Sequence, residues 1–238
     1  RRDTANGVNT GSVFVWRYDG AQWSYQELIE PDGRGLRNWG QRVTVDGDFV
    51  YISGGGRVYV FKHDGSSYAF VVSYTRPPGP SASGFGGRIE VNEQGQVFVG
   101  AAFNSVLSDR GTVFVYDRLG DDSLDFAQRI VPADVQVGDA FGWEVDMDGD
   151  RVVAGAFGED AAVSATTVRS NVGAVYIFKR DGLVWSDEQK LEEPESQSNA
   201  NFGVSVDLNG DALAVGASRF NPPQPTSGTY ADAGIVYL

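Results

Sequence analysis

The chain has 238 residues and a formal net charge of −13, a length sufficient for one substantial core or two small ones. The acidic balance argues against nucleic acid as a partner, because it would repel phosphate backbones. The lack of cysteine excludes disulfides and cysteine-based metal sites, a single histidine excludes multi-histidine metal sites, and no apolar run approaches the roughly 18 residues of a membrane span.

The composition predicts an all-β fold. Glycine (31 residues) and proline (9 residues) are frequent, and aromatic residues make up 12% of the chain. Between the glycines lie short runs rich in Val, Tyr and Phe, which favour strands, and we find no amphipathic helical window longer than about two turns. Many short strands joined by tight turns are therefore expected.

One strand-and-turn segment recurs along the chain. Its first copy has an apolar run at 13–16, typical of a strand covered on both faces, and then Asp19-Gly20, a preferred pair for a two-residue hairpin turn. A return strand over 22–31 completes this hairpin. The copies are GSVFVWRYDG (11–20), GRVYVFKHDG (56–65), GTVFVYDRLG (111–120), GAVYIFKRDG (173–182) and, truncated, GIVYL (234–238).

A second kind of hairpin precedes each later copy. These hairpins turn at Asp-Gly, Gln-Gly or Asn-Gly pairs and cover residues 39–55, 85–102, 141–157 and 202–218. A proline follows each return strand, at Pro31, Pro77, Pro132 and Pro194. Because proline cannot donate to a strand ladder, we expect the return strand at the outer edge of its sheet.

Two hairpins in series make a four-stranded antiparallel unit, and its repetition predicts a β-propeller whose blades stack on one another. We predict a single propeller region over 1–238, with blade units at about 11–38 (partial), 39–84, 85–140, 141–201 and 202–238 (incomplete). These amount to about four blades' worth of a larger propeller, completed by further chain or by a partner. A compact four-bladed closure is the alternative.

The second kind of hairpin resembles an FG-GAP repeat. Phe141-Gly142, Asp148-Gly149-Asp150 and Val153-Ala154-Gly155-Ala156 carry the likeness, and similar residues recur at 202–217, at 85–101 and, in degenerate form, at 39–54. FG-GAP repeats build the seven-bladed propeller of integrin α subunits and of many bacterial and algal secreted proteins. The resemblance implies a seven-bladed propeller, an extracellular or cell-surface location, and a role in adhesion, recognition or scaffolding.

That family carries calcium in the loop between the first and second strands of a blade. Here Asp146, Asp148 and Asp150 provide alternating carboxylates, but Val152 begins the next strand at once. A calcium site needs six to eight oxygens gathered by a loop with room to curl, whereas Asp-Gly turn chemistry explains the same residues without a metal. We expect no cofactor, with these three aspartates as the candidate ligands if calcium binds.

The family binds ligands through the loops that join strands two to three and four to one. In this chain the two-to-three loops differ strongly in length, with the longer ones at roughly 102–110, 157–172 and 218–233, and long loops on a rigid scaffold concentrate recognition. Tolerated insertions are the alternative explanation. The candidate ligand-binding residues are Arg110, Glu159, Asp160, Arg169, Arg219, Phe220 and Tyr230.

Aromatic residues are expected mainly in the core. Trp16 and Trp23 have aromatic counterparts in other copies, so we expect them to pack in the core or between blades. Trp143, directly after an aromatic–glycine pair, has no such counterpart. His63 precedes a turn and is expected to be a solvated turn residue rather than a catalytic base.

These features predict a non-enzymatic recognition, adhesion or scaffold module that binds a protein or a glycan, or other subunits of an assembly. A carbohydrate-active enzyme, a lyase or hydrolase, is one alternative, and it requires Glu159 and Asp160 to face acidic or basic residues from another blade within a pocket. A calcium-dependent adhesion module is the other, and calcium should then raise its melting temperature.

Overall fold

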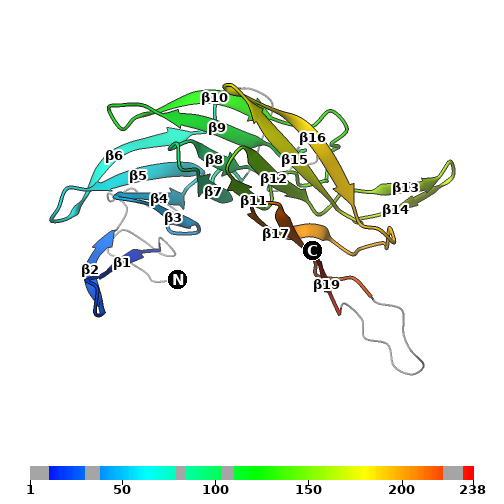
Figure 1. Ribbon diagram of the computed structural model, residues 1–238, viewed down its shortest axis with the longest axis horizontal. Coiled ribbons are helices and arrows are strands. Elements are labelled where there is room, and N and C mark those ends of the chain that lie inside the picture. Colours follow the sequence, from blue (N-terminus) through cyan, green and yellow to red (C-terminus); the bar gives the residue numbers. More distant parts are fainter. Residues whose placement is uncertain (1–10, 30–37, 79–83, 103–109, 222–232) are drawn as a thin grey trace.

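The computed structural model describes residues 11–29, 38–78, 84–102, 110–221 and 233–238, and it consists of strands joined by turns and loops (Figure 1). The predicted all-β fold is thereby confirmed. Within the described ranges, no helix is long and apolar enough to cross a membrane.

The strands form successive antiparallel sheets. The first sheet contains β1 (Val13–Tyr18) and β2 (Trp23–Ile29). Three four-stranded sheets follow, namely β3 (Val43–Asp46), β4 (Phe49–Gly54), β5 (Arg57–His63) and β6 (Tyr68–Thr75); β7 (Arg88–Val91), β8 (Val97–Gly100), β9 (Val113–Arg118) and β10 (Leu124–Ile130); and β11 (Val145–Asp148), β12 (Arg151–Ala156), β15 (Ala174–Asp181) and β16 (Val184–Glu192). The last sheet contains β17 (Phe202–Asn209), β18 (Ala212–Ala217) and β19 (Ile235–Tyr237).

Within each sheet the spatial order follows the chain, so the return strand of each full sheet lies at the edge, as its proline predicts. The expected loop over 157–172 differs from the prediction, because it contains a separate hairpin of β13 (Ala161–Ser164) and β14 (Thr167–Arg169). Ala162 pairs with Val168 in this hairpin, which projects beyond the main sheets (Figure 1).

The sheets follow one another in an arc, with the short first strands on its inner side (Figure 1). β3 contacts β7, β7 contacts β11, and β11 contacts β17. Polar side chains join these inner strands, since Thr44 Oγ1 donates a hydrogen bond to the Ile89 carbonyl and the Asp146 carboxylate accepts one from the Leu208 amide at 2.6 Å. First strands around a common axis and fourth strands at the periphery are the arrangement of propeller blades.

The apolar core lies between neighbouring sheets. Phe98 and Ile130 of one sheet belong to the same buried cluster as Phe141 and Trp185 of the next. The rings of Phe98 and Trp185 meet edge to face, with centroids 5.3 Å apart. Each sheet therefore buries its faces through its neighbours, as the repeat pattern predicts.

The aromatic–glycine pairs explain how the sheets fit together. Phe141 packs on Tyr176 and Phe178 of its own third strand, with ring centroids 5.5 and 5.9 Å away. Glycines at the start of third strands also contact the next sheet, because Gly173 (φ +90°) forms a parallel bridge with Phe202 and a Cβ there would lie 2.1 Å from the Phe202 carbonyl oxygen; Gly111 is placed in the same way against Phe141. Only glycine permits this close approach at positive φ.

The first sheet exposes aromatic residues that were expected to be buried. Trp16 is 55% exposed and Trp23 is 68% exposed, so the expected core role of both is wrong. Phe178, the counterpart of Trp16, is buried because Phe141 covers it. No aromatic–glycine pair within the described residues packs on Trp16 in this way, and its ring contacts Tyr25 instead.

Candidate functional site

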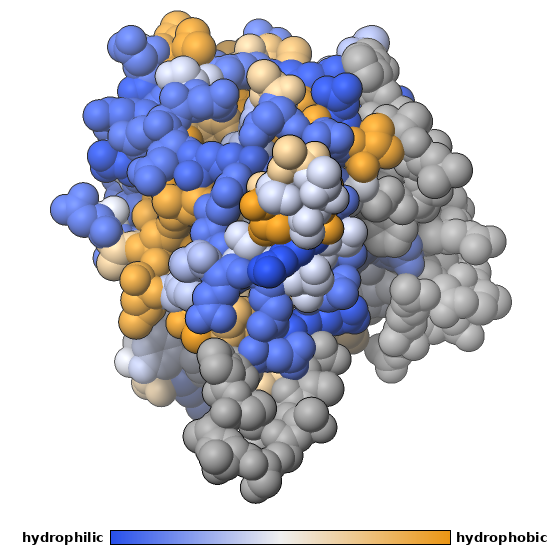
Figure 2. Space-filling view, turned by 90° about the vertical axis from the view of Figure 1, so that its right-hand side faces the viewer, coloured by the Kyte–Doolittle hydropathy of each residue, from blue (hydrophilic) through white to orange (hydrophobic). Residues whose placement is uncertain are grey.

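The loops at one end of the strands form a surface that we call the loop face. Its described parts are 38–42, 55–56, 76–78, 84–87, 101–102, 110–112, 131–144, 157–173, 193–201 and 218–221. Backbone hydrogen bonds tie neighbouring loops together, from the Asn201 amide to the Asn171 carbonyl at 3.1 Å and from the Arg219 amide to the Ala200 carbonyl at 3.1 Å. Seen from the side of β13 and β14, the described surface is mainly hydrophilic, with hydrophobic residues in separate patches (Figure 2).

One pocket opens on the loop face where the starts of β3, β7 and β11 come together. Its volume is about 290 Å³. We call it the axial pocket, because the three strands that supply it are the inner strands of successive sheets. The residues that define it include Gln41, Arg42, Phe85, Gly87, Gly142 and Trp143.

Arg42 lies at the axial pocket in a fixed orientation. Its Nε donates to the Gly87 carbonyl at 2.8 Å and its Nη1 to the Gln41 carbonyl at 3.2 Å. Burial and the charge of Arg88 lower the pKa of Arg42 from its usual value, yet an arginine remains charged in a protein. Nearby, Arg88 is neutralised by an ion pair with Glu144.

Trp143 forms an aromatic part of the pocket. It is 36% exposed, and its indole meets the Phe157 ring edge to face with centroids 4.9 Å apart. Phe157 therefore holds the indole in place while part of it remains open to the pocket. A positioned aromatic surface beside a guanidinium is a common combination in ligand sites.

A second pocket, which we call the acidic pocket, lies between the connections 134–139 and 158–171. Its volume is about 370 Å³. Four carboxylates line it, two from each connection: Asp134, Asp139, Glu159 and Asp160. The described residues contain no group of three or more His, Cys, Asp or Glu side chains arranged to hold a metal ion.

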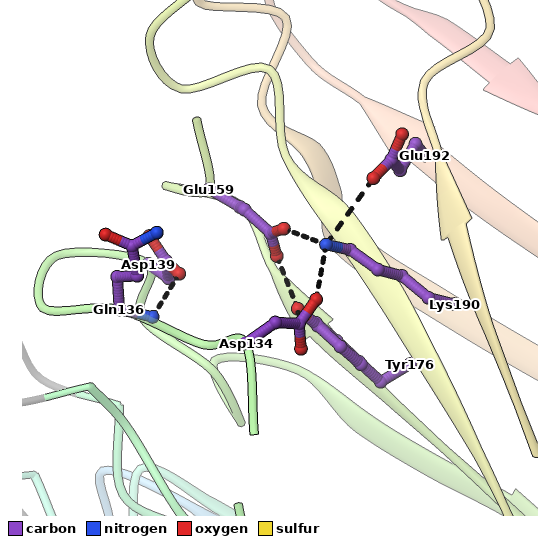
Figure 3. Close-up of polar contacts among 7 residues, drawn as sticks. All are labelled: Asp134, Gln136, Asp139, Glu159, Tyr176, Lys190 and Glu192. Atoms are coloured by element: carbon purple, nitrogen blue, oxygen red, sulfur yellow. Dashed lines mark hydrogen bonds and ion pairs between the residues drawn. The ribbon is translucent and has the colours of Figure 1, made fainter. Parts of the chain in front are cut away.

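Lys190 on β16 neutralises much of this acidity (Figure 3). Its Nζ donates a hydrogen bond to Asp134 Oδ2 at 2.8 Å and lies 3.4 Å from Glu192 Oε1. It also forms an ion pair with Glu159. The Tyr176 hydroxyl lies 2.8 Å from Glu159 Oε2 and 3.2 Å from Asp134 Oδ1. These contacts join two connections to β15 and β16, so they fix the base of the long loop 157–173.

The environment moves the pKa values of these carboxyls in opposite directions. Burial raises the pKa of Glu159, although hydrogen bonds from Lys190 and Tyr176 oppose the shift. Burial also raises the pKa of Asp139, against the hydrogen bond from the Gln136 amide. For Asp134, burial is outweighed by the hydrogen bond and charge of Lys190, so its pKa is lowered.

The predicted ligand residues do not share one environment. Glu159 and Asp160 meet in the acidic pocket, and Arg169 on β14 donates to the carbonyls of Glu195 and Ser196 at 2.9 and 2.7 Å. Arg110 and Arg219 are exposed on the loop face.

Phe220 differs from the prediction, because it is only 2% exposed and packs against Tyr237, with ring centroids 6.3 Å apart. As a core residue it is not available to a ligand on the loop face. Tyr230 lies outside the described residues.

The three candidate calcium ligands engage separate partners. Asp146 and Asp148 accept hydrogen bonds from the amides of Leu208 and Gly210 in the next sheet, at 2.6 and 2.5 Å. Asp150 forms an ion pair with Arg151 at 3.5 Å. These carboxylates therefore join sheets and turns, and they are not gathered around one point.

The sequence did not indicate the axial pocket, Lys190 or Asp134. A signal for the axial pocket was present, because the residue after each aromatic–glycine pair varies between copies: Gln41, Gly87, Trp143 and Val204. Lys190 lies in a charged outer strand, and nothing in its spacing marks it. The sequence alone gave no signal for Asp134 either.

Comparison with solved structures places this geometry in a fold class. A crystal structure of a protein from Lactobacillus plantarum matches with a TM-score of 0.53 and 19% identity, covering 84% of this chain and 52% of that one. A candidate 6-phosphogluconolactonase from Bacteroides fragilis matches with a TM-score of 0.50 and 14% identity, covering 75% and 43%. The chain thus spans about half the length of these proteins. At such identities the likeness shows the fold alone, and that fold is a β-propeller.

The family follows from the sequence of the repeats. Residues 125–178 and 185–238 match the FG-GAP repeat family. The chain therefore contains two adjacent FG-GAP repeats over these residues, and the resemblance noted from its hairpins is confirmed there. No curated protein matches the chain.

Proposed function

We propose that this protein is a non-enzymatic recognition module that binds a protein or a glycan through its loop face. The axial pocket carries the proposal, since both Trp143 and Arg42 line it. The hydrogen-bonded loops support it, because a rigid surface loses little conformational entropy on binding. An extracellular or cell-surface setting, suggested by the family resemblance, belongs to the same proposal.

The acidic pocket supports a second candidate function, a glycoside-cleaving hydrolase. It brings Glu159 and Asp160 together with Asp134 and Asp139 from the connection between two sheets, and carboxyls with pKa values moved apart are suited to acid and base roles. The contacts of Glu159 favour the first proposal, because Lys190 and Tyr176 already engage both of its oxygens.

A binding panel with a turnover assay tests the two candidates together. The immobilised chain is exposed to glycans and extracellular proteins, and the polysaccharides are assayed for release of reducing ends. We expect retention without turnover, and a loss of about fivefold or more in affinity when exposed Arg110 and Arg219 are both changed to alanine. The matched control changes Lys179 and Arg180, two cations at the opposite ends of the strands.

Any of three results would overturn the proposal. Retention of no glycan or protein would remove the recognition role. Turnover that is lost in Asp139→Asn, a substitution outside the Lys190 network, would replace it with the hydrolase. Equal losses in the Arg110–Arg219 variant and in the control variant would remove the loop face as the binding surface.

A further inference from the structure

The repeats bring together the residues at one position that differs between copies. In each copy the aromatic–glycine pair packs between sheets, as Phe85 and Phe141 show with exposures of 6% and 0%. The next residue is Gln41, Gly87 or Trp143 in three successive copies, and all three line the axial pocket. The scaffold positions thus stay similar while the position that faces the axis differs. This division is expected where a repeat scaffold supports a specific ligand site.

Trp143 is the aromatic member of this set. Its ring is braced edge to face by Phe157 and is partly open to the pocket. Gly87, at the matching position on the neighbouring strand, adds no side chain. A flat ligand ring with an apolar face can therefore lie against the indole, the arrangement that aromatic side chains favour.

Arg42 gives the pocket its charge. Its Nε and Nη1 are held by backbone carbonyls, and within the described part of the chain no residue accepts a hydrogen bond from Nη2 and no carboxylate lies within ion-pair distance. Glu144 forms its ion pair with Arg88 and also acts on Arg42 through its charge, so the two arginines share this one carboxylate. Although the chain has a formal net charge of −13, the Arg42 guanidinium at this pocket can bind an anion, and guanidinium groups favour carboxylates.

The size of the pocket limits the ligand. Its volume of about 290 Å³ is at the small end of ligand pockets, which span roughly 300–1,000 Å³. We propose that the axial pocket binds a single sugar ring that carries a carboxylate, a uronic acid residue, with the ring on Trp143 and the carboxylate on Arg42. This inference rests on the proposed recognition function and specifies its ligand class.

Calorimetric titration of the full chain with glucuronate and galacturonate tests the inference. We expect saturable binding of at least one, and binding at least about tenfold weaker for the corresponding neutral sugar. Arg42→Gln should reduce the affinity for the uronate to that for the neutral sugar. Trp143→Ala should weaken both, and Trp143→Phe, which keeps an aromatic ring and the fold, should weaken them less.

Two variants serve as controls, Lys179→Gln at the opposite ends of the strands and Trp23→Ala on the exposed first sheet, and both should bind like the unmodified chain. Failure of both uronates to saturate would overturn the inference. Unchanged binding in both Arg42→Gln and Trp143→Ala would also overturn it, as would competition by acetate at the same concentration as the uronate. If the uronates fail while the loop face still retains a macromolecule, the proposed function stands and only this ligand is wrong. If the uronates bind and the panel retains nothing, the pocket stands and macromolecular recognition fails.

Discussion

Glu90 offers a direct test of the electrostatics at the propeller axis. It lies on the inner strand β7, half-buried, and burial together with the charge of Asp146 raises its pKa to about 7. The folded chain therefore binds a proton at Glu90 more tightly than the unfolded chain. It follows that stability falls as pH rises from about 4.5 towards 8, because the proton must be lost from the folded state.

The substitution Glu90→Gln removes this charge with little change of shape. A shift from 4.5 to about 7 corresponds to at most about 3 kcal/mol at pH 8. Since the side chain keeps some contact with solvent, we expect a gain of about 1–2 kcal/mol in the free energy of unfolding at pH 8. At pH 4 the gain should vanish, because both folded and unfolded chains carry the proton.

Urea unfolding followed by tryptophan fluorescence at pH 8, 6 and 4 measures this difference. The matched control is Glu93→Gln, an exposed glutamate in the turn after β7, which should change the stability by less than about 0.5 kcal/mol at every pH. If Glu90→Gln changes the free energy of unfolding, relative to the unmodified chain, by the same amount at pH 8 and at pH 4, the assigned role of burial and of Asp146 is refuted.

Three further predictions follow from the contacts between sheets. Gly173→Ala should lower the free energy of unfolding in urea by about 3–5 kcal/mol, because its Cβ would lie 2.1 Å from the Phe202 carbonyl oxygen. The control Gly182→Ala, at φ +62° with open space around it, should lower it by about 1 kcal/mol. Equal losses in the two variants would contradict the close-approach argument. Lys190→Met should lower the free energy of unfolding by about 2 kcal/mol, because it removes the ion pairs with Glu159 and Asp134. The control Lys179→Met, whose partner Asp150 is 4.0 Å away on the surface, should lower it by less than about 0.5 kcal/mol. Millimolar calcium should move the melting temperature by less than about 1 °C, because Asp146 and Asp148 already accept backbone hydrogen bonds, and a larger rise would show that these carboxylates exchange their partners for the ion.

The strands and sheets could be predicted from sequence because local chemistry determines them. Asp-Gly and Asn-Gly pairs specify hairpin turns, apolar runs specify covered strands, and the order of the two hairpins specifies the order in the sheet. Trp16 shows the limit of this reasoning. Its strand was correctly predicted, but its burial depends on an aromatic residue of another strand, and none of the described aromatic–glycine pairs packs on it.

The loop residues were harder to predict, because their environment is set by distant parts of the chain. Phe220 belongs to a loop in sequence, yet Tyr237 of β19 covers it. Glu159 was predicted as a ligand-binding loop residue, but Lys190 on β16 forms an ion pair with it and Tyr176 on β15 hydrogen-bonds to it. Burial of a charged group is stable only with such partners, so the presence of Glu159 at the base of a long loop implies a cation that spacing alone does not locate.

Comparison of the repeat copies separates residues that pack the scaffold from residues that are available to a ligand. An aromatic residue that recurs in the copies, such as Phe141, packs on matching aromatic residues of the third strand, as Phe85 does on Phe114 and Tyr116, and can be assigned to packing from sequence. A residue that differs between copies at a position facing the axis is free of that packing role, as Gln41, Gly87 and Trp143 are. In a propeller, equivalent positions on successive inner strands converge on one axis, so variation among repeats at such a position indicates where a ligand site can form even when no motif for that site exists.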